Sequence, residues 1–343
     1  MHTLMGQLCS SEEEFSQVKD VIGSLLFDTM LEGGAVPDLA VVHRLVLADH
    51  NEPRNAKTRL QEQLKQLQVN IGKRAPTYLR DLIGHLAGFS HEPRLAGLVG
   101  LVVTMVMDMA CMSSEKSQGV AGKSTGSSSS QQRVWELQEL MEEYLKRSKI
   151  NLSDRKRLID DSVRLEAQLS FTLTQVKTCL LGGDCDSRSL RLWASGAVFH
   201  IQMLVHLAGL EGQAEPRAAE AALDQYKEDL GQIIPVYRCY KSNTVRAVKR
   251  RGGLLASHVP SGDVGEDGAM TGVTVTDRET GKSVTIPLSD LETETGRRRN
   301  TSTPVNLDLI TSDQYAQAYL DQLFSKKGPV VELENDFIKA VTF

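Results

Sequence analysis

The feature of this sequence that most constrains its fold is a run of nineteen residues, 192–210, that contains no Asp, Glu, Lys or Arg. A helix of that composition is apolar on every side, so other helices or lipid must cover it on every side. His200, Gln202 and His206 interrupt the run, and each of these side chains is costly in a bilayer. We therefore expect a central helix buried in a bundle, and membrane insertion is the alternative.

A second run, residues 95–107, is also uncharged but is short for a membrane span. If the bundle released both runs at a bilayer, histidine protonation at about pH 6 would provide the switch. The candidate membrane contacts are Leu95, Leu98, Leu101, Val102, Val103, Val106, Trp193, Phe199 and Leu204.

Amphipathic helices surround these runs, because apolar residues repeat at intervals of three and four. A Glu-Pro-Arg junction occurs three times, at 52–54, 92–94 and 215–217, and proline suits the first position of a helix. The unequal spacing of the junctions argues against a tandem repeat. A Ser-Glu-Glu-Glu sequence at 11–14 predicts a capping box that opens the first helix. We expect helices over about 11–32, 37–49, 53–71, 76–88, 93–112, 153–181, 187–210, 216–230 and 311–326, and a further helix that begins near Val134.

Two segments break the helical pattern. Residues 113–132 are rich in Ser, Gly, Lys and Gln and predict a flexible loop. Residues 272–288 alternate Val and Thr around a glycine-containing turn and predict a β-hairpin. The expected fold class is all-α, a multi-helix bundle with a Ser-rich loop and a small β-hairpin appendage near the C-terminus. The expected regions are 1–112, 113–132, 133–245 (packing with the first), 246–310 and 311–343.

Composition excludes some classes of function. The net charge of −5 argues against a general nucleic-acid-binding surface. The five scattered cysteines do not form a disulfide framework, and the N-terminus lacks the pattern of a signal peptide. We therefore expect an intracellular, cytoplasmic protein.

No catalytic or ligand-binding motif is complete. The Gly-Lys-Ser at 122–124 resembles the end of a phosphate-binding loop, but Ser117 occupies the position that needs glycine. His200 and His206 are six residues apart, so they point to different faces of a helix and do not form a metal-ligand pair. We predict no catalytic residue, no metal, no cofactor and no enzymatic activity.

Two short basic or phosphorylatable segments remain. A basic patch of Arg246, Lys249, Arg250 and Arg251 suits acidic lipid headgroups or an acidic partner, or it is a solvated helix end. Thr301 and Thr303 are candidate phosphorylation sites, since arginines precede the first and proline follows the second.

These observations favour a non-catalytic intracellular interaction or scaffold protein whose amphipathic helices contact a partner protein of unknown identity. The alternative is a membrane-active helical bundle that inserts conditionally or resembles a pore-forming protein. An acidic membrane surface is a further candidate partner. Nucleic acid is not an expected partner.

Overall fold

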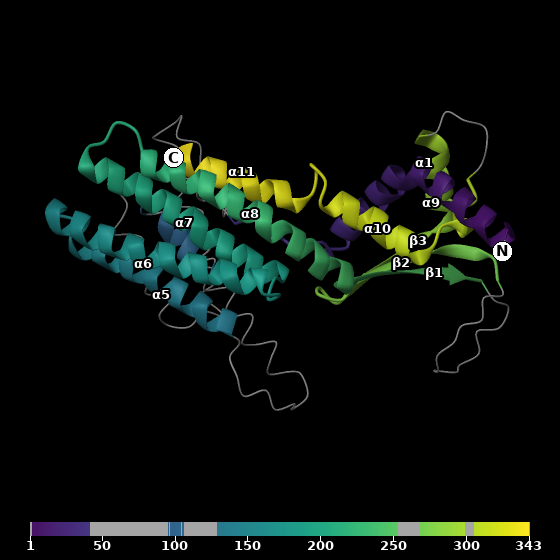
Figure 1. Cartoon of the computed structure of the whole chain (residues 1–343), viewed down its shortest axis with the longest axis horizontal. Coiled ribbons are helices and arrows are strands. Elements are labelled where there is room, and N and C mark those ends of the chain that lie inside the picture. The colour runs from purple at the N-terminus through teal and green to yellow at the C-terminus, as the bar shows by residue number, and fades with distance from the viewer. Residues whose placement is uncertain are drawn as a thin grey trace, which may run out of the picture. The chain divides into compact units, whose positions relative to one another are not determined.

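The computed structural model describes residues 2–41, 95, 97–103, 105, 129–252, 268–298 and 305–342 (Figure 1). It confirms the predicted fold class, because helices dominate and a small antiparallel sheet lies toward the C-terminus. The elements are α1 (His2–Glu32), α5 (Ser129–Ile150), α6 (Arg155–Leu181), α7 (Ser187–Glu211), α8 (Arg217–Thr244), β1 (Val245–Arg251), β2 (Met270–Asp277), β3 (Lys282–Pro287), α9 (Leu288–Arg298), the 3-10 turn η2 (Leu307–Leu309), α10 (Ser312–Leu323) and α11 (Pro329–Thr342).

The chain divides into two compact units. The first combines Met1–Asp38 with Arg238–Val331, and the second combines Leu39–Tyr237 with Glu332–Phe343. Helix α1 packs against α9, α10 and β3. A small sheet is stable in water only when its apolar face is buried. Helix α1 therefore supplies apolar surface that covers the sheet, although the strands lie more than two hundred residues further along the chain.

The sheet of the first unit has the order β1-β2-β3, with both strand pairs antiparallel. The predicted hairpin is present as β2 and β3, and Gly281 adopts a left-handed φ of 68° in its turn. Strand β1 was not predicted, since the sequence showed only a basic cluster there. Its burial alternates, with Val245 and Ala247 inside and Arg246 outside, as a strand with one covered face requires.

Helices α1, α9 and α10 pack against the sheet and form the core of the first unit with its inner face. The predicted capping box at 11–14 is wrong, because α1 already begins at His2 and these residues lie inside the helix. Core side chains include Val18, Ile22 and Leu26 of α1, Val273 and Val275 of β2, and Tyr315 and Tyr319 of α10.

An ion-pair cluster also ties the helices of the first unit together. The Asp321 carboxylate on α10 accepts hydrogen bonds from Lys19 of α1 and from Arg238 of α8. Burial by itself would raise the pKa of Asp321, but these bonds and one from Gln317 together outweigh burial and lower it. The carboxylate therefore stabilises the unit at neutral pH, and this contribution is lost as the pH falls through the lowered pKa.

Helix α7 is the centre of the second unit, which confirms the predicted central helix. It packs against α5 and α6, and the Trp193 ring also contacts Tyr226 of α8 and Phe337 of α11. Its buried residues include every position from 192 to 208. Dispersion and hydrophobic contacts on all sides, rather than one amphipathic face, hold this helix.

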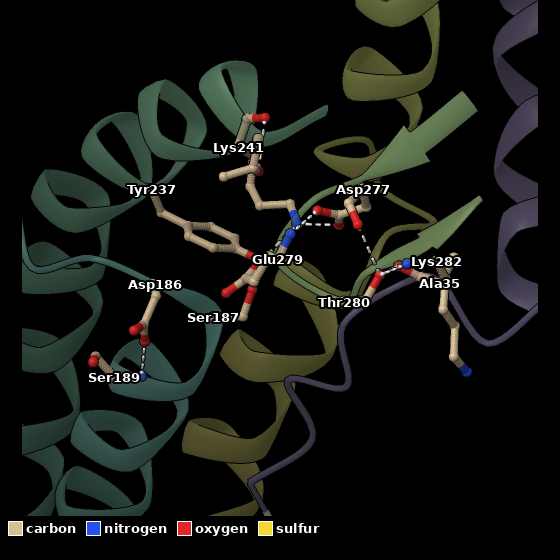
Figure 2. Close-up of polar contacts among 11 residues, drawn as sticks. Ala35, Asp186, Ser187, Ser189, Tyr237, Lys241, Asp277, Glu279, Thr280 and Lys282 are labelled. Atoms are coloured by element: carbon tan, nitrogen blue, oxygen red, sulfur yellow. Dashed lines mark hydrogen bonds and ion pairs between the residues drawn. The ribbon is translucent and has the colours of Figure 1, made fainter. Parts of the chain in front are cut away.

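The ends of α7 follow from local sequence. The Asp186 carboxylate accepts the backbone N–H of Ser189 and caps the first turn (Figure 2). Gly212 ends the helix with a left-handed φ of 73°, and α8 begins directly after Pro216. The third Glu-Pro-Arg junction is thus a helix corner, as predicted. The other two junctions lie outside the described residues.

We predict that Gly196 is required for the close approach of α7 to its neighbours. A Cβ at this position would lie 2.7 Å from Leu137 Cδ2 and 2.9 Å from Leu173 Cδ2. Gly196→Val should lower the free energy of unfolding by about 1–3 kcal/mol through overpacking. Gly231→Ala is the control, because a Cβ there meets nothing within 4 Å, and helix propensity should raise stability by up to about 1 kcal/mol.

Urea denaturation followed by tryptophan fluorescence measures both variants. Both tryptophans, Trp135 and Trp193, belong to the second unit, so the signal reports on it alone. A Gly196→Val protein as stable as the wild type would contradict the close approach.

Candidate functional site

A buried chain of polar side chains links three helices of the second unit. The Tyr226 hydroxyl on α8 lies 2.7 Å from His200 Nδ1 on α7. His200 Nε2 lies 2.9 Å from a Glu166 carboxylate oxygen on α6. All three groups are satisfied when the neutral imidazole accepts from the phenol and donates to the carboxylate. Below, we name this Tyr226–His200–Glu166 series the histidine relay.

The histidine relay combines residue types that occur in catalytic sites, but its electrostatics are those of a structural group. Burial raises the pKa of Tyr226 well above its usual value, and the nearby Asp229 and Glu166 raise it further. The phenol therefore stays protonated at physiological pH and is not an activated nucleophile. A similar contact joins the Tyr144 hydroxyl of α5 to His206 Nδ1 at 2.6 Å.

The candidate membrane contacts are buried wherever the structure describes them. Leu95, Leu98, Leu101, Val102, Val103, Trp193, Phe199 and Leu204 are all less than one-tenth exposed, and Val106 lies outside the described residues. Among the described helices, only Ser187–Glu211 is long and apolar enough to cross a bilayer, and 94% of its most apolar window is buried. A core helix of a soluble protein meets the same criterion. Membrane insertion stays a prediction.

The four residues of the predicted basic patch lie on two opposite faces of β1. Lys249 and Arg251 turn toward Asp308, with Lys249 Nζ 2.9 Å from its carbonyl oxygen and Arg251 Nη2 2.9 Å from its carboxylate. Arg246 and Arg250 are exposed on the other face of β1. The patch is therefore two pairs of cations with different surroundings, and only one pair faces solvent freely.

The most deeply buried charges are in the first unit. The Lys241 ammonium of α8 is 0% exposed and pairs with Asp277, and Glu279 Oε2 lies 2.8 Å from it (Figure 2). Asp277 also accepts the backbone N–H of Glu279 at 3.0 Å. These contacts attach the end of α8 to the turn between β2 and β3. Buried ions of this kind require partners, since desolvation is costly.

The surface of the second unit has a groove of about 550 Å³ between α5 and α6. Its lining on α5 recurs at every third or fourth residue, which places the residues on one helical face. We name it the α5–α6 groove. It is lined by Arg133, Glu136, Glu139, Leu140 and Glu143 of α5 and by Gln168, Phe171, Thr172 and Gln175 of α6.

The lining of the α5–α6 groove combines apolar side chains with glutamates. Phe171 is 64% exposed, which is unusual for a large aromatic side chain, and Leu140 is half-buried beside it. Arg147 donates to Glu143 at 2.7 Å and lowers the pKa of that carboxyl, so it is ionised at neutral pH. Of the three lining glutamates, Glu136 pairs with Arg133 and Glu143 pairs with Lys146 and Arg147. Glu139 is exposed and has no ion-pair partner among the described residues.

Some of the predicted sites lie outside the residues that the structure describes. Thr301, Thr303 and the Gly-Lys-Ser at 122–124 are not among the described residues. Within the described ranges, no group of three or more His, Cys, Asp or Glu is placed to hold a metal ion. The absence of a metal, a cofactor and a catalytic residue from the whole chain stays a prediction.

Sequence reasoning missed the α5–α6 groove. The signal was present in α6, where Phe171 stands outside the buried stripe of Leu158, Leu165 and Leu169. What the sequence could not show was which face of α5 lies next to Phe171.

Comparisons of this chain with models of known protein families, with curated protein sequences and with solved structures give no match.

We predict that Tyr226 and His200 stabilise the second unit as a pair. His200→Leu should lower the free energy of unfolding by about 1–3 kcal/mol, because the buried phenol loses its acceptor. Tyr226→Phe should cost about 1 kcal/mol. The double variant should cost less than the sum, with a coupling of about 0.5–3 kcal/mol measured by urea denaturation and tryptophan fluorescence. Strictly additive costs would show that the pair does not interact.

We predict that Lys241→Met destabilises the first unit by about 3–5 kcal/mol, because it leaves Asp277 buried without its cation. Adding Asp277→Asn should restore part of the loss, since the orphaned charge is then removed. Lys249→Met is the matched control: its partner Asp308 is partly exposed, so the loss should stay below about 1 kcal/mol. Urea denaturation followed by circular dichroism measures all three, and equal losses at Lys241 and Lys249 would refute the prediction.

Proposed function

We propose that this protein is a non-catalytic intracellular interaction protein, and that its α5–α6 groove docks a cationic amphipathic helix of a partner protein. The observation that carries the proposal is the exposure of Phe171 in a groove whose lining includes three glutamates. An exposed aromatic side chain in a groove is a typical anchor for a partner.

The dimensions of the groove suit a helix. Its lining on α5 extends from Arg133 to Glu143, which at 1.5 Å per residue is about 15 Å. A docked helix of three turns has this length and would rest between α5 and α6 as a third helix. Its apolar residues at i, i+3 or i+4, and i+7 would contact Leu140 and Phe171.

The charge of the groove selects the sign of the partner. Glu139 is an exposed residue of the lining. The Glu136 Oε2 atom lies 2.6 Å from Arg133 Nη1 and forms an ion pair with it. Lys or Arg residues on the edges of the docked helix would meet these carboxylates, and such pairs increase the rate and specificity of association. An acidic helix would be repelled.

A partner helix fits this site better than a small ligand does. Small-molecule pockets enclose most of the surface of their ligand. Here the lining residue Phe171 is largely open to solvent, so the groove covers only one side of an occupant.

The membrane-active alternative has less support. Residues 192–208 of α7 would have to leave their contacts with α5, α6, α8 and α11 before they could meet lipid. It remains a second prediction, without an observation that favours it.

A model peptide tests the proposal. The probe is a fluorescent fourteen-residue helix with Leu at the i, i+4, i+7 and i+11 positions and Lys elsewhere, and its binding to the full-length protein is followed by anisotropy. Phe171→Ser should weaken binding by about thirtyfold or more, the size of a hot spot. Glu139→Lys should weaken it by a few-fold, and more at low salt than at high salt.

Two controls define the outcome. Val163→Ser removes an equally apolar, 48% exposed residue of the same helix outside the groove lining, and it should not change binding. A peptide of the same composition with scrambled Leu positions should bind weakly. The proposal fails if Phe171→Ser and Val163→Ser have the same effect or if the scrambled peptide binds equally well.

A further inference from the structure

The outward face of the sheet in the first unit carries a pattern of its own. Helices α1, α9 and α10 cover the opposite face. The outward residues of β1 are Arg246, Val248 and Arg250, all exposed. Next to them, hydroxyl side chains continue across the sheet at Thr274 and Thr276 of β2 and at Ser283 and Thr285 of β3.

No carboxylate faces the two arginines across the strands. The register places Arg246 opposite Thr276 and Arg250 opposite Gly272. Arg250 donates Nε–H to the Thr274 hydroxyl at 3.0 Å, which uses one of its five N–H donors. Among the described residues Arg246 has no ion-pair partner. By contrast, the alternate residues Lys249 and Arg251 are both held by Asp308.

The spacing of the arginines indicates several anionic groups rather than one. Four residues along a strand separate their Cα atoms by about 13 Å. Because both side chains leave the same face of the strand side by side, this spacing suits separate phosphates on an extended surface. Val248, 59% exposed, projects between them as an apolar side chain.

We infer that this face binds the phosphate-bearing headgroups of an anionic lipid membrane, as a peripheral contact independent of the α5–α6 groove. Arginine matches phosphate geometry, and threonine and serine hydroxyls donate to phosphate oxygens. The exposed valine enters the headgroup boundary between the two guanidinium groups. A single-stranded nucleic acid fits less well, because the outward face has no aromatic side chain on which bases could stack.

Charged residues also protect edge strands from pairing with other chains, and β1 is an edge strand. Protection alone predicts no affinity for vesicles. The two explanations therefore give different results in a binding experiment.

The experiment is flotation of the full-length protein with phosphatidylcholine vesicles and with vesicles that contain 30% phosphatidylserine. We expect binding to the anionic vesicles only, lost at high salt. Arg246→Gln with Arg250→Gln should lower the partition coefficient about 25-fold, since each basic residue near such a surface contributes about fivefold. Val248→Ser should lower it by a smaller factor.

The matched control is Lys249→Gln with Arg251→Gln, which removes the same charge from the same strand but from the side that faces Asp308. It should leave binding within about twofold of the wild type. If it unfolds the sheet, Arg157→Gln with Arg164→Gln on the surface of α6 makes the same change in net charge. Circular dichroism confirms that each variant is folded.

Three outcomes would overturn the inference. The first is that the wild type fails to float with anionic vesicles. The second is that the control pairs lose as much binding as the Arg246 and Arg250 pair. The third is that the protein binds a single-stranded oligonucleotide through these arginines but does not bind the vesicles.

Discussion

The need to cover α7 on every side organises the second unit. A helix with no charge over nineteen residues has no face that can remain in water, so α5, α6, α8 and α11 surround it. This enclosure also decides what happens to its polar residues. His200 and His206 cannot reach water from inside the bundle, so phenol groups on α8 and α5 satisfy them. The histidine relay is therefore a consequence of the packing of α7.

The sequence predicted those parts of the fold that depend on local pattern. The uncharged run located α7, the Pro216 junction located the start of α8, and the turn with Gly281 located the hairpin. It did not predict β1, because four of seven residues there are Lys or Arg and only Val245 and Ala247 mark a covered face. It could not pair α1 with the sheet, since that contact joins residues more than two hundred positions apart in the chain. Such pairings depend on which apolar surfaces meet, and periodicity within one segment carries no information about that.

The same distinction applies to the candidate sites. The sequence identified four basic residues, but only the strand register separates Arg246 and Arg250 from the pair that Asp308 neutralises. The α5–α6 groove depends on the relative rotation of two helices, which side-chain packing around Leu137 and Leu173 fixes. Residue types thus suggest a chemistry, whereas the geometry decides whether the residues act together.

The two proposed surfaces are opposite in charge and belong to separate units. The α5–α6 groove of the second unit is lined by three glutamates and by Phe171. The outward sheet face of the first unit carries Arg246 and Arg250 beside threonine and serine hydroxyls. Because like charges repel, a cationic partner helix is excluded from the sheet face and an anionic membrane is excluded from the groove. Each surface therefore selects its own ligand without interference from the other. The two proposals are therefore independent of each other, because each depends on charged residues of one unit alone.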